Sequence, residues 1–238
     1  MKICVVNESK LVSDEEVDLM CRAVEMQMMS HVFPAWDIKS GTIELTAKSK
    51  VPADAWLVNL LDDPTAAGAL GYHADDSDRV CGYIFAGPVL ENGGVVLFDK
   101  KNPQNMSVSS VLSHEVLEMV LDPYATTWVT GPAIMTDDGE TYTDFALELC
   151  DAVQGGPYSL VVDGYHVSLS DFILPAWTNP QAVEKDGPFN YLSTLTAPFT
   201  MGVGGYMILK NGHSETQVFG EKVSEQHKAH VKSEWYHR

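Results

Sequence analysis

The sequence predicts an α+β fold, with a mixed β-sheet, one long buried helix and a β-hairpin region towards the C-terminus. Short apolar runs rich in β-branched residues, such as residues 3–6, indicate buried strands. Between Ser107 and Pro123, apolar side chains cover nearly every side of a helical wheel, which indicates a helix surrounded by protein. Asp163-Gly164 lies between two alternating segments and is typical of a two-residue type I′ hairpin turn.

The composition is that of an ordinary globular protein and excludes several classes of partner. Of the 238 residues, 45% are hydrophobic and 20% are charged. The net charge of −18 should repel nucleic acid and anionic membranes, so we expect neither as a partner. Four widely spaced cysteines, with no Cys-x-x-Cys pair, predict reduced thiols in a cytoplasmic setting. We expect no signal peptide and no membrane span, because no apolar run is long enough for either.

The first half of the chain is expected to alternate between strands and helices. A capping box at Ser13 and Glu16 begins a helix that we expect to end at Pro34, since proline cannot continue the helical hydrogen bonds. The buried helix is expected to end at Pro123 for the same reason. Strands or extended pieces, the last two of them around an acidic turn, are expected at residues 3–6, 42–46, 55–61, 69–73 and 80–85.

The second half is expected to contain fewer regular elements. After Pro123 we predict a long connection over residues 126–138, because Gly131-Pro132 and Asp138-Gly139 are turn signals. An extended segment over 141–149, the hairpin and a last strand ending at 209 should follow. Since no repeat or low-complexity linker is present, we predict one domain over 1–220 and a polar tail over 221–238. The tail is expected to be a solvated helix or a segment that docks a partner.

Three ionisable residues of the buried helix, His114, Glu115 and Glu118, lie within an arc of about 100°. Such groups are costly in a buried helix unless something compensates them. His114 and Glu118 leave the same face one turn apart, which is the ligand geometry of His-Glu-x-x-His zinc enzymes with the second His replaced by Glu. Glu115 would then be the general base that acts on water at the metal. The alternative is a His114–Glu118 hydrogen bond inside a core.

A further metal ligand is expected from the segment Glu148-Leu-Cys-Asp151, because catalytic zinc normally takes three protein ligands. If this segment is extended, Glu148 and Asp151 face opposite ways and only one of them reaches the metal; if it turns, both can. Asp151 is preferred, since a residue at a strand end can approach a helix without displacing packing. Alternatively, both carboxylates cap a turn before Gly155-Gly156. Two carboxylate ligands would also admit Mn²⁺ or Ca²⁺ in place of zinc.

The predicted order of elements resembles the amino-terminal half of a zincin domain, that of zinc metallopeptidases of the metzincin type. In those domains an edge strand runs along the cleft and holds the substrate in extended form, and the following helix supplies metal ligands. The segment over residues 68–85 is similar in pattern to this edge-strand region. The resemblance implies a zincin fold: a mixed sheet with an active-site helix.

Several short motifs follow one another between residues 3 and 209. They are Val5-Val-Asn-Glu-Ser9, Ala69-Leu-Gly-Tyr-His73, Ser113-His-Glu-Val-Leu-Glu-Met119, Glu148-Leu-Cys-Asp151, Asp171-Phe-Ile-Leu-Pro-Ala-Trp177 and Gly204-Gly-Tyr206. Together they resemble an uncharacterised protein family of bacteria and tailed bacteriophages, some members of which are labelled metalloproteases. The matching residues include all five site candidates, which is consistent with a metal site. This chain departs from the family after Asp151, where Ala152-Val-Gln replaces a second Cys and an acid.

Two functions of different classes follow from these observations. The first is a zinc-dependent hydrolase of peptides or proteins, with His114, Glu118 and Asp151 or Glu148 on the metal and Glu115 as base. The second is a virion-associated structural or assembly protein of a phage, which keeps the zincin fold with or without metal and binds other virion proteins. The expected location is accordingly the host cytoplasm or the phage particle.

Overall fold

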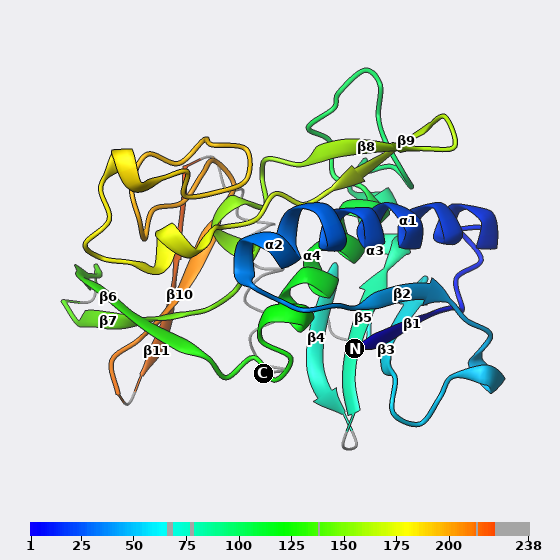
Figure 1. Cartoon of the computed structure of the whole chain (residues 1–238), viewed down its shortest axis with the longest axis horizontal. Coiled ribbons are helices and arrows are strands. Elements are labelled where there is room, and N and C mark those ends of the chain that lie inside the picture. The colour runs from blue at the N-terminus through cyan, green and yellow to red at the C-terminus, as the bar shows by residue number, and fades with distance from the viewer. Residues whose placement is uncertain (66–68, 77–78, 138, 213, 222–238) are drawn as a thin grey trace.

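The computed structural model describes residues 1–65, 69–76, 79–137, 139–212 and 214–221, and its fold is a mixed α+β fold with several sheets (Figure 1). The α-helices are α1 (Asp14–Gln27), α2 (Phe33–Trp36), α3 (Ala86–Glu91) and α4 (Val108–Leu121). The strands are β1 (Lys2–Asn7), β2 (Thr42–Leu45), β3 (Trp56–Leu61), β4 (Gly71–Asp76), β5 (Arg79–Phe85), β6 (Trp128–Met135), β7 (Thr141–Ala146), β8 (Tyr158–Val162), β9 (Tyr165–Leu169), β10 (Tyr206–Lys210) and β11 (Glu215–Phe219). Short 3₁₀ helices span Lys48–Lys50, Asp151–Val153, Pro175–Thr178 and Glu184–Asp186.

The largest sheet has five strands in the order β2-β1-β3-β5-β4. Strands β1, β2, β3 and β5 are parallel, and β4 pairs antiparallel with β5 at the end of the order. Helices α1 and α4 contact each other and pack against this sheet, α1 beside β1 and β2 and α4 beside β5 and β4 (Figure 1). The strands expected in this half are confirmed, including the two extended pieces around the acidic turn, which are β4 and β5. Their apolar residues meet those of the two helices in one hydrophobic core.

Helix α4 has the bounds that the sequence predicts. The side chain of Ser107 accepts a hydrogen bond from the backbone N–H of Ser110 and caps the helix. The last turn ends at Asp122, before Pro123, as expected. Apolar residues around the whole helix are buried, among them Leu112, Val116 and Leu117. The helix is therefore enclosed by protein, so its ionisable side chains need partners that compensate for their burial.

The first helical region does not end at Pro34, so that prediction is wrong. Helix α1 continues through a π turn at Met28–Val32 into α2, and Pro34 lies in the first turn of α2. Proline has no backbone N–H, but a first helical turn needs no donor at that position, and the fixed φ of proline suits the helix. The region ends at Asp37, which has φ of +53°.

The predicted connection after α4 is also wrong, because residues 128–135 form strand β6 of a four-stranded antiparallel sheet in the order β11-β10-β7-β6. The turn signal Gly131-Pro132 lies where the β6–β7 register shifts, between Thr130 and Ile134. An irregular position of this kind accepts both residues in a strand. The expected hairpin is confirmed as β8 and β9, with Asp163 and Gly164 at positive φ.

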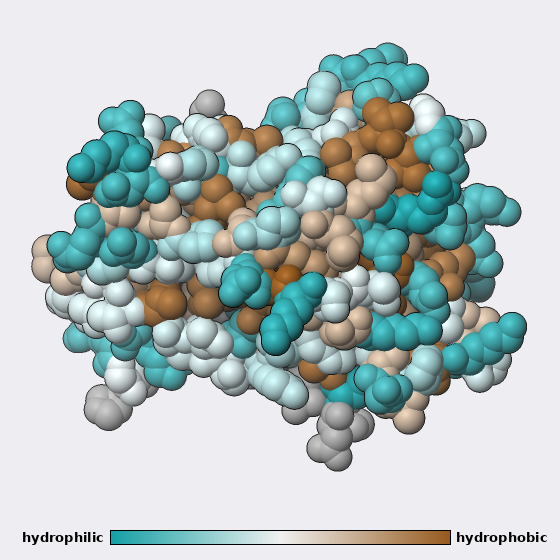
Figure 2. Space-filling model, viewed as in Figure 1, coloured by the Kyte–Doolittle hydropathy of each residue, from teal (hydrophilic) through white to brown (hydrophobic). Residues whose placement is uncertain are grey.

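The outer surface mixes hydrophilic side chains with small apolar areas (Figure 2). One such area lies at the β8–β9 hairpin, where Val161 and Tyr165 are more than half exposed. No helix among the described residues is both long and apolar enough to span a bilayer. Of the predicted polar tail, residues 222–238 lie outside the described residues.

Candidate metal centre

Helix α4 brings its three ionisable side chains to one buried side, as the sequence predicts. Glu115 and Glu118 are 6% and 4% exposed, and the side chain of His114 is 13% exposed. Nε2 of His114 lies 3.2 Å from Oε1 of Glu118, one helical turn away. The structure therefore confirms that these two side chains share one face, which both the metal hypothesis and the core hydrogen bond require.

The segment after β7 turns, and it brings both acidic candidates to α4. Oδ1 of Asp151 lies 3.2 Å from Nε2 of His114. Glu148 is buried and belongs to a group with His73 and Glu118 whose potential ligand atoms all lie within 4.8 Å of one another. Asp151 is not at a strand end, since β7 stops at Ala146 and Asp151 begins a 3₁₀ turn. The segment from Glu148 to Asp151 is therefore turned and not extended, so both carboxylates can lie near the helix.

A hydrogen bond from Cys150 anchors this turn on the helix. Its backbone N–H donates to Oε1 of Glu118 over 3.2 Å. The Cys150 thiol is buried and forms a second group of potential ligands with His114 and Glu118. Burial raises the pKa of this thiol well above its usual value. A carboxylate oxygen that accepts a backbone N–H is held in one orientation, so Glu118 is fixed relative to the turn.

His73 is a site residue that the sequence argument missed. It lies on β4 with its side chain 4% exposed, and its Nδ1 is 3.6 Å from Oε2 of Glu115 and 3.9 Å from Oε2 of Glu118. Its Nε2 is 3.1 Å from the backbone oxygen of Asp122 at the end of α4, the distance of a hydrogen bond from Nε2–H. That hydrogen bond leaves Nδ1 as the ring nitrogen that faces the carboxylates. The motif over residues 69–73 contained the only sequence signal, and nothing in its spacing relates it to α4.

Strand β4 and helix α4 approach each other closely at a glycine. A Cβ atom placed on Gly71 would lie 3.0 Å from both Cγ and Oε1 of Glu115, and 3.0 Å from the backbone oxygen of Tyr83. Such distances are shorter than ordinary van der Waals contacts. The absence of a side chain at Gly71 therefore allows Glu115 to lie against the strand, on the side where His73 lies.

The shifts in pKa show how strongly these groups interact. Burial by itself lowers the pKa of His114, but the charge of Glu118 and the hydrogen bonds to Asp151 and Glu118 raise it well above the usual value. Burial and the nearby charge of Glu118 raise the pKa of Asp151 to about 7. Both groups therefore hold a proton more firmly than they would in water. In the metal-free protein, a proton held between His114 and the carboxylates of Glu118 and Asp151 gives the positive charge that a bound cation would give.

The donor atoms fit a divalent cation. Bonds of about 2.1 Å in a tetrahedral zinc site separate its ligand atoms by about 3.4 Å. His114 Nε2 lies 3.2 Å from an oxygen of Glu118 and 3.2 Å from an oxygen of Asp151. Imidazole nitrogen and carboxylate oxygen are common ligands of zinc and manganese. The two distances from His114 and the chemistry of these donors therefore suit such an ion. In the present arrangement of side chains, the potential ligand atoms around His114 that all lie within 4.8 Å of one another are those of His114, Glu118 and Cys150.

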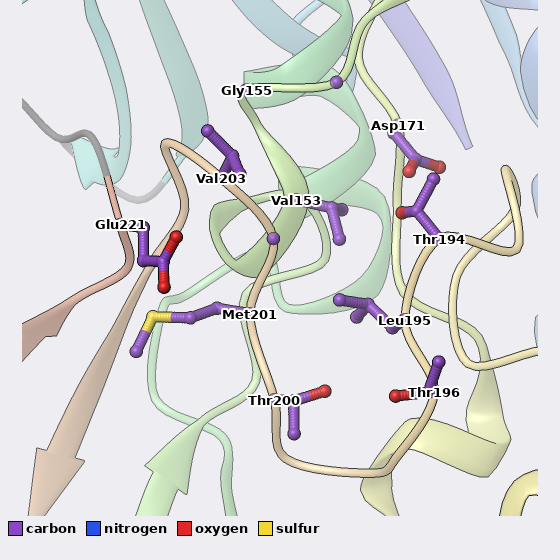
Figure 3. A pocket seen from close by; sticks show the side chains of 12 residues that line it. Val153, Gly155, Asp171, Thr194, Leu195, Thr196, Thr200, Met201, Val203 and Glu221 are labelled. Atoms are coloured by element: carbon purple, nitrogen blue, oxygen red, sulfur yellow. The ribbon is translucent and has the colours of Figure 1, made fainter.

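A pocket of about 530 Å³ lies beyond the 3₁₀ turn that begins at Asp151 (Figure 3). Val153 of this turn lines it, together with the loop over residues 194–203, and no candidate ligand lines it. Its buried acid, Asp171, accepts hydrogen bonds from the backbone N–H groups of Phe172 and Leu192, and burial raises its pKa to about 6. Asp171 thus connects its own segment to the backbone at Leu192, beside the pocket.

Comparisons of the chain with models of known protein families, with curated proteins and with solved structures found no match. We therefore infer function from the geometry of the histidines and the buried carboxylates.

Proposed function

We propose that the protein is a metal-dependent hydrolase with a zincin-like fold that acts on peptides or proteins. One divalent cation, zinc in the first instance, would be held by His114, Glu118 and Asp151. The observation that carries this proposal is that Nε2 of His114 lies 3.2 Å from a carboxylate oxygen of each partner. Glu118 and Asp151 are buried, and the side chain of His114 is 13% exposed. The three residues come from two separate segments, the helix α4 and the turn after β7.

The surroundings of α4 support the zincin-like part of the proposal. Strand β4, antiparallel at the end of the five-stranded sheet, packs directly against the helix that carries the candidate ligands. In the zincin domains that the sequence resembles, an edge strand has this position. The resemblance to a family of bacterial and phage proteins, some of them labelled metalloproteases, also supports a metal-dependent hydrolase and is independent of the geometry.

A zinc ion bound here would supply a Lewis acid that polarises the scissile carbonyl group. The protein's own contribution would be made chiefly by Glu115, which follows His114 on the helix. Its carboxylate would accept a proton from the attacking water and later return it to the leaving amine. His73 lies beside that carboxylate, with Nδ1 3.6 Å from Oε2 of Glu115. The low exposure of the whole group would keep competing water away from these charges.

Replacement of Glu115 by Gln tests the proposal most simply. Gln keeps the shape of the side chain and removes its basicity, so we expect hydrolysis of a peptide library by the zinc-loaded protein to fall about 10²- to 10⁴-fold. The zinc content should remain that of the wild type. Glu44→Gln, at an exposed position of β2 that pairs with Lys2, is the matched control and should leave hydrolysis unchanged.

Two other outcomes would contradict parts of the proposal. Loss of zinc in Glu115→Gln would make Glu115 a ligand instead of a base. A zinc-loaded wild type that hydrolyses no peptide, ester or amide would favour the second function, that of a phage assembly protein which retains the fold and the metal.

A further inference from the structure

The carboxylate of Glu118 lies between two histidines and presents a different oxygen to each. Its Oε1 is 3.2 Å from Nε2 of His114, and its Oε2 is 3.9 Å from Nδ1 of His73. A carboxylate that faces two separate nitrogen donors in this way can bind one cation through each oxygen. The cation of the proposed function uses only the oxygen on the His114 side.

A second set of donors is present on the other side of Glu118. His73, Glu118 and Glu148 are each no more than 6% exposed, and their potential ligand atoms all lie within 4.8 Å of one another. They come from β4, from α4 and from the segment after β7. Three protein ligands of nitrogen and oxygen are the usual complement of a catalytic zinc or manganese site.

His73 is oriented as a metal-binding histidine is. Metal-bound histidines generally donate their other ring N–H to a carboxylate or to a backbone carbonyl. Here Nε2 lies 3.1 Å from the backbone oxygen of Asp122, and Nδ1 faces the carboxylates. This observation is independent of the distances among the acidic residues, because it concerns the opposite side of the imidazole ring.

The charges of the cluster also favour two cations. Four carboxylates of this cluster are buried: those of Glu115, Glu118, Glu148 and Asp151. Residues that bind a metal lose their protons, so the four carboxylates are counted as ionised and the histidines as neutral. One divalent cation would then leave this group with a charge of 2 − 4 = −2, and a second cation would bring it to zero. Uncompensated charge in a buried space is costly, so the balance favours the second ion.

We propose that the protein binds a second divalent cation, held by His73, Glu118 and Glu148, and that the carboxylate of Glu118 bridges the two cations. This inference rests on the proposed function, because the first cation shares Glu118. Zinc and manganese suit the donor set, and paired cations in hydrolases lie about 3.5–4 Å apart. The two ions together would place positive charge on both sides of Glu118, towards β4 as well as towards the turn after β7.

Metal stoichiometry tests this inference. Metal-free full-length protein would be dialysed against zinc, passed over a desalting column and analysed for zinc and protein. We expect two zinc ions per chain in the wild type and one in His73→Ala. His166→Ala, at an exposed histidine of β9, is the matched control and should retain two.

The other outcomes separate the two proposals. One zinc per chain in both the wild type and His73→Ala would overturn the second site and leave the proposed function standing. One in the wild type and none in His73→Ala would also overturn it, since His73 would then hold the single ion. No zinc in the wild type would overturn both proposals.

A measurement on the wild type avoids any dependence on a variant's folding. With manganese in place of zinc, a bridging carboxylate should couple the two ions magnetically. We expect the electron paramagnetic resonance spectrum of the saturated protein to be that of an exchange-coupled pair. A spectrum of isolated manganese ions at saturation would overturn the bridged pair. Glu148→Gln, which keeps the side-chain shape, should convert the coupled spectrum into the isolated one.

Discussion

Nδ1 of His73 lies 3.6 Å from Oε2 of Glu115, across the contact between strand β4 and helix α4. The helix has a single histidine, so the second imidazole of the cluster comes from a strand that is paired at the end of the sheet. The carbonyl of Asp122, at the end of the same helix, accepts from the other side of that ring. The end of helix α4 thus orients the imidazole ring that β4 carries.

Gly71→Ala should impair the site more than the fold. The new Cβ would lie 3.0 Å from Cγ and Oε1 of Glu115, so the carboxylate must shift away from β4. Overpacking of this kind costs about 1–3 kcal/mol of stability. We expect hydrolysis by the zinc-loaded variant to fall at least about tenfold, because small displacements of a catalytic group are costly. Peptide hydrolysis and thermal unfolding of the same sample measure both effects.

Gly156→Ala is the control for this substitution, since a Cβ there would meet only the backbone oxygen of Val153, at 3.6 Å. It should retain wild-type hydrolysis. Unchanged hydrolysis in Gly71→Ala would contradict the role assigned to Glu115.

The stability of the metal-free protein should fall as the pH rises from about 4 to about 8. The folded-state pKa of His114 is raised above its usual value of 6.5. The stabilisation that protonated His114 gives the fold is therefore complete below pH 6.5 and is lost as the pH rises through the folded-state pKa. The pKa of Asp151 is raised from 3.8 to about 7, so the stabilisation that its protonated carboxyl group gives the fold is lost between those two pH values.

Zinc should reverse this dependence, because ligands bind a metal only after they lose their protons. We expect the zinc-induced increase in Tm to grow with pH over the same range, as measured by thermal unfolding with and without zinc. An increase that is the same at about pH 5 and about pH 8 would show that His114 and Asp151 do not release protons when the ion binds.

Asp151→Asn should weaken zinc binding and stabilise the metal-free protein at about pH 8. The amide removes a buried negative charge and keeps the size of the side chain, while it loses an anionic ligand. We expect the zinc Kd to increase at least about tenfold, measured by competition with a chelator. Asp144→Asn, on β7 and outside the cluster, should leave the Kd unchanged. An unaltered Kd in Asp151→Asn would exclude Asp151 as a ligand and leave Glu148 as the acidic candidate.

Helix α4 and its paired residues could be predicted from the sequence because all the necessary information is local. Ser107 and Pro123 mark its ends, and spacing alone places His114 and Glu118 on one face. The turn after β7 could not be predicted, for a physical reason. Whether Glu148 and Asp151 face opposite ways depends on where the strand stops, and that depends on contacts with α4 such as the hydrogen bond from Cys150.

His73 could not be predicted, because its role is created by the sheet. The pairing of β4 with β5 sets the register of His73, which lies opposite Gly82, and packing of α4 on both strands brings the ring to Glu115. Neither relationship leaves a periodic signal within β4. Strand β6 was missed for a related reason, since Gly131-Pro132 is tolerated only because the register shifts there.

Ser107→Ala should destabilise the fold without altering the proposed metal site. The Ser107 side chain caps α4, and loss of an N-cap costs about 0.5–2 kcal/mol. We expect urea unfolding of the metal-free variant to show a loss in that range, with an unchanged zinc Kd, because His114 lies almost two turns further along the helix. A change in Kd larger than about threefold would indicate that the start of α4 positions the ligands.

Anomalous diffraction at the zinc absorption edge, from crystals of the wild-type protein soaked in zinc, tests the central claim most directly. The account predicts a strong peak about 2.0–2.2 Å from Nε2 of His114 and from carboxylate oxygens of Glu118 and Asp151. Crystals that show saturating zinc elsewhere on the surface and no peak beside His114 would contradict it.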